Sequence, residues 1–336
     1  MEDQNIQQAS GRKSTAWIWV VVVLIIIIAG GVIAYFLLRG NSASKSTTTT
    51  SKTTDVTAQK WVRDPTESVD KGVTSTDTHK ISDSAVRTYF MKDGEIQYAE
   101  STDGAKIYAA AQSTGINQEK GSFISNPVVL EISSGKWIMI YEQKPEPKPG
   151  QEQGKTPPGP DTQRDLYLAT STDGKTFQKV DRVIDSAKED NYFASVPDLV
   201  KLPDGKIRMY YVSGGEAIGS ATSSDDGKSW VRDSGYRLQN SAVDPDVVYK
   251  DGKWLMYYSN LDPQKNALYL STSSDGIKWQ EGVKILDRAG SSGSIVDPDV
   301  FEFGGKNIML FGEFLGGDSA TTQESPDLYR AVEQNN

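Results

Sequence analysis

The sequence predicts an all-β fold, a five-bladed β-propeller of four-stranded blades, preceded by one N-terminal transmembrane helix and a Ser/Thr-rich linker. Three observations predict it: an apolar run near the N-terminus, a unit of about fifty residues that recurs through the rest of the chain, and Asp-Gly turns within each unit. Four antiparallel strands per repeat of this length are typical of a propeller blade. The expected boundaries are a tail over 1–15, the helix over 16–38, the linker over 39–58 and the propeller over 59–336.

The apolar run, Ala16–Leu38, contains no charged residue. A helix that spans a bilayer needs about 20 apolar residues, whereas a cleavable signal peptide has an apolar region of about 7–15, so we expect an uncleaved anchor. Cleavage near Ser42–Ser44 is the alternative. Basic residues lie on both sides of the run, so the positive-inside rule does not decide its orientation.

The next stretch, residues 41–57, is nearly all Ser, Thr, Lys and Ala, a composition that indicates a flexible tether. A short tail, a span, a tether and a large domain suggest a single-pass protein of the cell membrane with an extracytoplasmic propeller. The chain contains no cysteine and no Asn-x-Ser/Thr sequon, which in an extracellular domain favours a bacterial origin.

Composition excludes several kinds of chemistry. Without cysteine there is no disulfide scaffold, thiolate metal site or cysteine nucleophile, and His79 is the only histidine. The net charge of −9 argues against a nucleic-acid ligand, because binding phosphates requires a basic face. We therefore expect no nucleic-acid partner.

The repeat consists of a strand that begins with x-Pro-x, a Gly-Lys turn and a second apolar strand. It occurs at 126–141, 196–211, 244–258 and 297–311, and a weaker copy at 75–90 aligns on 196–211 without a gap. Each of the first four copies is followed by a Ser-x-Asp-Gly hairpin, at 101–104, 171–174, 223–227 and 273–276. Glycine supplies the positive φ of such turns, and the short apolar runs between turns suit strands better than helices.

The fourth repeat illustrates the strands expected of one blade, at 246–249, 254–259, 268–272 and 278–282. The fifth repeat lacks a fourth strand after its third, 328–332. Residues 60–64 resemble the fourth strand at 228–233. We therefore predict that residues 60–64 pair with 327–332 and close the ring, which leaves no open sheet edge.

These motifs resemble those of the five-bladed superfamily of arabinanases, levansucrases and invertases, above all glycoside hydrolase families 43 and 32. The hairpins also resemble the Asp-box of sialidases. The resemblance implies a carbohydrate ligand, hydrolysed by one carboxyl group as acid and another as base or nucleophile. The family's aspartates precede proline in the first and third blades, and its acid is a glutamate near a later entry. Here Ser75, Asn126 and Val196 stand at three entries, so the family's trio does not carry over.

Strand direction places the ligand face where first strands begin and second strands end. The catalytic candidates are Asp244 and Asp297, which precede proline, as base or nucleophile, and Glu142 and Glu313 as acid. The ligand-binding candidates are Asp77, Asn126, Asp198, Asp246, Asn260 and Asp299. For the Asp-Pro-Asp pairs, hydrogen bonding to backbone amides and Ca²⁺ coordination are alternatives. The Pro-rich insertion at 143–164 belongs to the same face and forms either a lid or a disordered loop.

Two functions fit this sequence. The first is a membrane-anchored extracellular glycoside hydrolase-like protein, and the alternative is a non-catalytic cell-surface propeller that binds glycan or protein. The superfamily and the acidic ligand face favour the first, while the absent trio favours the second.

Overall fold

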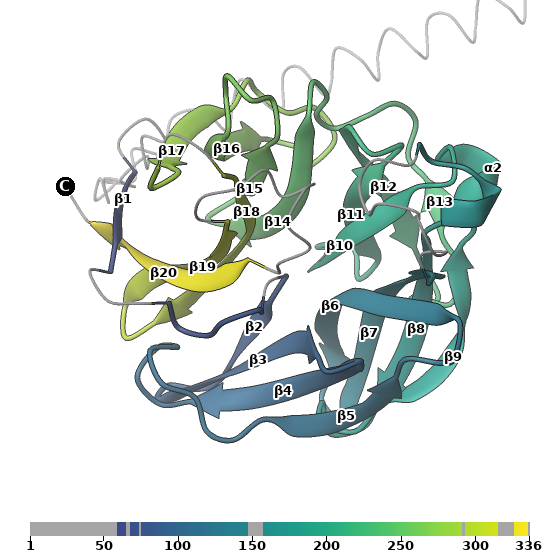
Figure 1. The fold of residues 1–336 in the computed structure, drawn as a ribbon, viewed down its shortest axis with the longest axis horizontal. Coiled ribbons are helices and arrows are strands. Elements are labelled where there is room, and N and C mark those ends of the chain that lie inside the picture. The colour runs from purple at the N-terminus through teal and green to yellow at the C-terminus, as the bar shows by residue number, and fades with distance from the viewer. Residues whose placement is uncertain are drawn as a thin grey trace, which may run out of the picture. The chain divides into compact units, whose positions relative to one another are not determined.

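The computed structural model describes residues 59–64, 68–73, 75–146, 157–290, 293–314 and 326–334. These residues form five four-stranded antiparallel sheets, which follow one another around a ring (Figure 1). The predicted five-bladed propeller is thereby confirmed. The tail, the transmembrane segment and the linker predicted over 1–58 lie outside the described residues. Within the described ranges, no helix is long and apolar enough to cross a membrane.

Each blade runs from an innermost to an outermost strand. Blade 1 comprises β2 (Asp77–Ser82), β3 (Ala85–Lys92), β4 (Glu95–Ser101) and β5 (Gln112–Asn117). Blade 2 comprises β6 (Ser122–Ser133), β7 (Lys136–Pro145), β8 (Asp165–Ser171) and β9 (Gln178–Ile184). Blade 3 comprises β10 (Ala194–Lys201), β11 (Ile207–Ser213), β12 (Ala217–Ser223) and β13 (Val231–Arg232). Blade 4 comprises β14 (Ala242–Lys250), β15 (Lys253–Asn260), β16 (Ala267–Ser273) and β17 (Val283–Asp287), and blade 5 comprises β18 (Ile295–Phe303), β19 (Lys306–Glu313), β20 (Asp327–Gln334) and β1 (Lys60–Arg63). Two short helices, η2 (Pro160–Thr162) and α2 (Ser186–Glu189), lie in connections.

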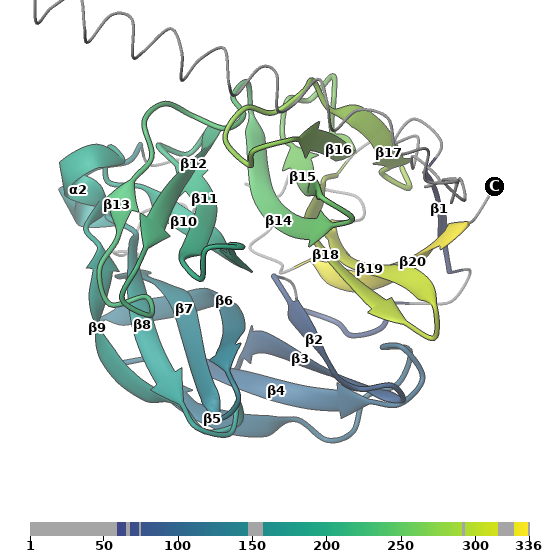
Figure 2. The ribbon, with the colours of Figure 1, turned by 180° about the vertical axis from the view of Figure 1, so that it is seen from behind.

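The ring closes through β1, as the sequence predicts. Lys60 pairs with Gln334 and Arg63 with Ala331. In Figures 1 and 2 the purple β1 lies beside the yellow β20. Trp61 packs edge-on against Tyr257, with ring centroids 5.9 Å apart, inside a core shared by blades 4 and 5. The N-terminal strand therefore completes the last blade.

The hydrophobic core is divided among the interfaces between blades. In β7, Ile138 and Ile140 face the interface with blade 3, whereas Met139 and Tyr141 face blade 1. Side chains alternate between the two faces of a strand, and here both faces are buried. This is why the second strand of each repeat is apolar throughout rather than alternating.

The Ser-x-Asp-Gly turns are held by a common hydrogen-bond pattern. The serine hydroxyl donates to the aspartate at Ser101–Asp103, Ser171–Asp173, Ser223–Asp225 and Ser273–Asp275. Each aspartate also accepts backbone N–H groups of its own hairpin. These bonds account for the recurring aspartates as parts of the turn.

The fourth strand of blade 4 lies later in the chain than the sequence predicts. It was expected at 278–282 but lies at Val283–Asp287, because β17 pairs with the first half of β16, Tyr269 opposite Lys284. Gly282 precedes the strand beneath a tyrosine: a Cβ there would lie 2.1 Å from the Tyr258 hydroxyl oxygen. Trp279 forms an isolated antiparallel bridge with Ser273, so the predicted segment touches β16, but continuous pairing begins only at Val283, after Gly282 has passed Tyr258.

Candidate functional site

Five entry turns surround the axis of the propeller, one from each blade. The residue at the entry has a left-handed backbone in every case, with φ of 51° at Ser75, 50° at Asn126, 43° at Val196, and 53° at Asp244 and Asp297. In blades 2 to 5 the register between the first two strands shifts at this point, as in a β-bulge. Asn and Asp tolerate this conformation, whereas a β-branched residue such as Val196 is strained in it. Strain of this kind clusters at functional sites.

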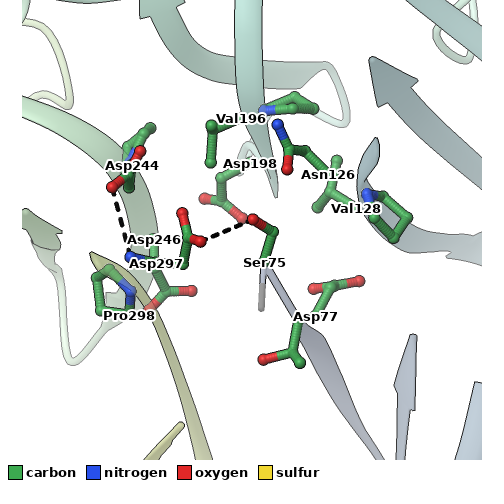
Figure 3. Close-up of a pocket in the computed structure, with 14 residues that line it drawn as sticks. Ser75, Asp77, Asn126, Val128, Val196, Asp198, Asp244, Asp246, Asp297 and Pro298 are labelled. Carbon is green, nitrogen blue, oxygen red and sulfur yellow. Dashed lines mark hydrogen bonds between the residues drawn. The ribbon is translucent and has the colours of Figure 1, made fainter. Parts of the chain in front are cut away.

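A small pocket lies between these turns (Figure 3). It is lined by Ser75, Thr76, Asp77, Asn126, Pro127, Val128, Val196, Pro197, Asp198, Asp244, Pro245, Asp246, Asp297 and Pro298. Its volume is about 30 Å³, room for one or two water molecules. Six of the ten predicted site residues line it, and Asp299 lies next to it, bonded to the Thr76 hydroxyl at 2.8 Å.

Asp244 and Asp297 form a carboxylate pair on neighbouring blades. The backbone N–H of Asp297 donates to Asp244 Oδ2 at 3.4 Å, and the Ser75 hydroxyl donates to Asp297 Oδ2 at 2.8 Å (Figure 3). The same N–H also donates to Ser259 Oγ at 3.1 Å. Asp244 is 7% exposed. Burial, and then the charge of Asp297, raise the pKa of Asp244 well above its usual value. The pair thus includes a carboxyl group that favours its protonated form.

The aspartates two residues further along form a second ring, which links blades together. Asp77 accepts the N–H of Val129 at 2.7 Å, Asp198 that of Val247 at 2.9 Å, Asp246 that of Val300 at 3.2 Å and Asp299 that of Thr78 at 3.2 Å. In each case the carboxylate belongs to one blade and the amide to the next. Blade 2 has Val128 at this position. These four predicted ligand-binding aspartates therefore act as clasps between blades. For Asp246 and Asp299 this is the hydrogen bonding to backbone amides that the sequence offers as an alternative for the Asp-Pro-Asp pairs.

Three of these aspartates have raised pKa values. Burial, and then the charge of Asp77, raise the pKa of Asp198 to about 8 and that of Asp299 to about 6. Burial and the charges of Asp198 and Asp299 raise the pKa of Asp246 well above its usual value. His79 Nε2 lies 2.8 Å from Asp77 Oδ2; burial lowers the pKa of His79, but Asp77 outweighs burial and raises it.

The Ca²⁺ alternative finds no support in this geometry. Among the residues that the structure describes, no group of three or more His, Asp or Glu side chains is placed to hold a metal ion. The oxygens of the second ring are used on backbone amides instead.

Glu142 is buried beneath the entry turns of blades 2 and 3 and does not line the pocket. Its Oε1 lies 3.3 Å from Arg164 Nη1 and 3.9 Å from Lys144 Nζ, and its Oε2 accepts Asn126 Nδ2 at 2.8 Å and the Ser195 hydroxyl. Burial alone would raise the pKa of Glu142, but the two cations outweigh burial and lower it. Asn126 is thereby turned toward Glu142.

Glu313 and Asn260 also lie away from the pocket. Glu313 is buried in a two-pronged ion pair with Arg63, at 2.6 and 3.1 Å. Asn260 donates to Asn240 O at 3.2 Å and accepts the N–H of Asp262 at 3.0 Å, at a different pocket between blades 3 and 4. Arg63 and Arg164 are the partners that sequence reasoning missed, and nothing in their local sequence marks them as such.

The Pro-rich insertion predicted over 143–164 is described at its two ends. Strand β7 continues to Pro145, η2 begins at Pro160, and Arg164 bridges to Phe193 of the following connection. Residues 147–156 lie outside the described residues, so the prediction of either a lid or a disordered loop stays a prediction.

The five-bladed propeller fold is shared with solved structures of glycoside hydrolases. An α-L-arabinofuranosidase from Lactobacillus brevis superposes with a TM-score of 0.63 at 11% identity, over 82% of this chain and 93% of that one. An exo-β-1,3-galactanase from Clostridium thermocellum gives 0.59 at 12%, over 82% and 63%. A family 117 glycoside hydrolase from Zobellia galactanivorans gives 0.59 at 12%, over 82% and 90%. No protein-family model and no curated protein sequence matches the chain. At these identities the likeness shows the fold.

Proposed function

We propose that the protein is a glycoside hydrolase-like propeller that cleaves a glycan at the mouth of the axial pocket. Asp244 acts as the proton donor, and Asp297 acts as the base or nucleophile. The observation that carries this proposal is the pair itself, in which one carboxyl group is buried and favours its protonated form beside a more exposed second one. Glycoside hydrolysis requires two carboxyl groups in different protonation states.

The surroundings of the other acids support this assignment. Glu142 is ion-paired with Arg164 and has a lowered pKa, and Glu313 is ion-paired with Arg63. A general acid must carry a proton near the working pH, which the environment of Glu142 opposes. The volume of about 30 Å³ is too small for a sugar ring, so the substrate lies above the entry turns and not between them.

The location of the propeller is part of the proposal. The apolar stretch 16–38 would anchor the chain in the cell membrane, and the Ser/Thr-rich stretch 39–58 would carry the propeller outside the cell. The support for both comes from composition.

A second candidate, the non-catalytic surface propeller that binds glycan or protein, is favoured by one observation. Three of the five entries present Ser75, Asn126 and Val196 instead of a carboxylate. Such a face could bind sugar hydroxyls without cleaving a bond.

A hydrolysis screen with the full-length protein separates the two candidates. The substrates are arabinan, xylan, fructan and a sialoside, and the variants are Asp244→Asn and Asp297→Asn. We expect turnover to fall by about 100-fold or more in either variant, because each removes one half of the acid–base pair, with ligand binding retained in calorimetry.

The matched control is Asp246→Asn, which changes the other aspartate of the same Asp-Pro-Asp motif and should keep most of the turnover. Equal losses in all three variants would count against the assignment of Asp244 and Asp297. A folded wild type that binds glycan without cleaving any substrate would establish the surface binding module instead.

A further inference from the structure

Ser75 occupies the entry of blade 1, at the position where blades 4 and 5 have Asp244 and Asp297. Its hydroxyl donates to Asp297 Oδ2 at 2.8 Å across the junction of blades 1 and 5 (Figure 3). Both residues line the axial pocket. The acid–base chemistry proposed for Asp244 and Asp297 leaves this serine without a role.

The chain that follows Ser75 is held to the strand that carries Asp297. The hydroxyls of Thr76 and Thr78 donate to Asp299 Oδ2 at 2.8 and 2.6 Å, and the Thr78 N–H donates to Oδ1 at 3.2 Å. Asp299 is 4% exposed and belongs to β18, as Asp297 does. These hydrogen bonds fix the start of blade 1 against β18, so a rigid backbone presents the Ser75 hydroxyl to Asp297.

The titratable neighbours of Asp297 in the described part of the pocket are all carboxyl groups. They are Asp77, Asp198, Asp244 and Asp246, and none of the described lining residues is Lys, Arg or His. His79 contacts this ring through Asp77, at 2.8 Å. Glu142 and Glu313, by contrast, are paired with arginines. Because like charges disfavour ionisation, a neutral donor such as a hydroxyl is what this pocket offers to stabilise a carboxylate.

We propose that Ser75 is a positioning residue, whose hydroxyl holds Asp297 in the orientation and the ionised form that a base or nucleophile requires. This role rests on the function proposed for Asp297. A donor to a carboxylate favours the ionised form and fixes the direction of the group. Since Ser75 stands where the entries of blades 4 and 5 have a carboxyl group, it also keeps a further like charge away from the pair.

The test is the titration of Asp297 in the full-length protein, followed by NMR of its carboxyl carbon, whose signal Asp297→Asn identifies. Ser75→Gly removes the hydroxyl and suits the φ of 51° at this position. We expect the midpoint for Asp297 to rise by about one pH unit, because a hydrogen bond to a charged group is lost. The acid limb of the pH–rate profile should move by the same amount, so turnover on that limb falls about tenfold.

Ser75→Asp is the second variant and places a carboxyl group at the blade 1 entry. Asp244 and Asp297 already adopt this backbone conformation, so the variant keeps the test open if Ser75→Gly fails to fold. It should raise the Asp297 midpoint at least as far, because it adds a like charge as well as removing the hydroxyl. Thr78→Val is the matched control: it removes a hydroxyl bond between the same two blades, made to Asp299, and should leave the Asp297 midpoint unchanged.

An Asp297 midpoint that stays in place in Ser75→Gly and Ser75→Asp would overturn the proposal, and so would an equal shift in Thr78→Val. A shifted midpoint with an unmoved acid limb would separate Ser75 from turnover and overturn the positioning role. The function proposed for the axis fails differently, through turnover that persists in Asp297→Asn. The NMR midpoint requires no turnover, so it still decides whether Ser75 holds Asp297 ionised.

Discussion

At the scale of single residues, partners distant in sequence decide what each carboxyl group can do. Asp244 and Glu142 are both buried, yet burial and a like charge favour the acid in Asp244, whereas Arg164 and Lys144 favour the carboxylate in Glu142. Burial alone would have made the two alike. The difference lies in the sign of the nearest charge.

The Glu142 ion pair leads to a prediction about stability. Arg164→Met should destabilise the protein by about 3–5 kcal/mol, because it removes a main partner of a buried charge. Glu142→Gln should cost less and should leave turnover intact if Asp244 is the acid. Chemical denaturation and the hydrolysis assay check the two parts. Turnover abolished by Glu142→Gln in a protein of unchanged stability would restore Glu142 as the acid.

Much of the axial site follows from sequence, but the roles of its residues do not. The repeat predicts that Asp77, Asp244 and Asp297 lie together around the axis, where the structure has them, because a repeat puts equivalent residues at equivalent heights around one axis. Arg63 pairs with Glu313 across the junction of the chain's two ends, and no spacing rule reports such a contact. The hydrogen bonds by which the second-ring aspartates link neighbouring blades join residues of different repeats, so the sequence of a single repeat does not reveal them.

At the scale of elements, the four-residue strand β1 contributes both strand pairing and core packing to the closed ring. It covers the outer edge of β20 and adds Trp61 to the core between blades 4 and 5. Its position was predictable because Lys60–Asp64 repeats the sequence of another outer strand. The outer strand of blade 4 begins later than predicted, because a hairpin motif fixes the turn but not how many residues follow before continuous pairing resumes.

Truncating the Trp61 side chain tests how much β1 contributes to closing the ring. Trp61→Ala should cost about 3–5 kcal/mol, as large-to-small changes in a core do. It should also speed amide exchange in β20, because β1 is its outer neighbour. Trp230→Ala, at the same repeat position inside a continuous blade, is the control and should leave β20 protected. Unchanged exchange in β20 would show that β1 is not needed to close the ring.

At the scale of the whole propeller, the axial acids couple stability to pH. The pKa values of Asp198, Asp299, Asp244 and Asp246 are raised in the folded state above that of an unfolded aspartate, about 3.9. The folded protein therefore binds more protons than the unfolded chain above that pH, and stability falls as pH rises through the folded pKa values. His79, with a raised pKa, acts in the same direction, whereas Glu142 opposes it below about pH 4.

We therefore expect the free energy of unfolding to fall by several kcal/mol between pH 5 and pH 8. Denaturant titrations across this range measure it. Asp198→Asn should flatten the slope, because the pKa of Asp198, about 8, lies at the top of that window. A stability that rises steadily to pH 8 would contradict the raised pKa values of these four aspartates.

The pairing of β1 with β20 also sets an order in time. Val62 pairs with Val332, so 332 − 62 = 270 positions separate the partners. At about 5–20 residues per second, β1 leaves the ribosome roughly 15–50 s before the strand that it joins. During synthesis blades 1 to 4 can form before the blade 5 part of the core around Trp61 exists. The ring can therefore close only after β20 has been synthesised, and a chain stalled before β20 would leave β1 without the strand that it pairs with.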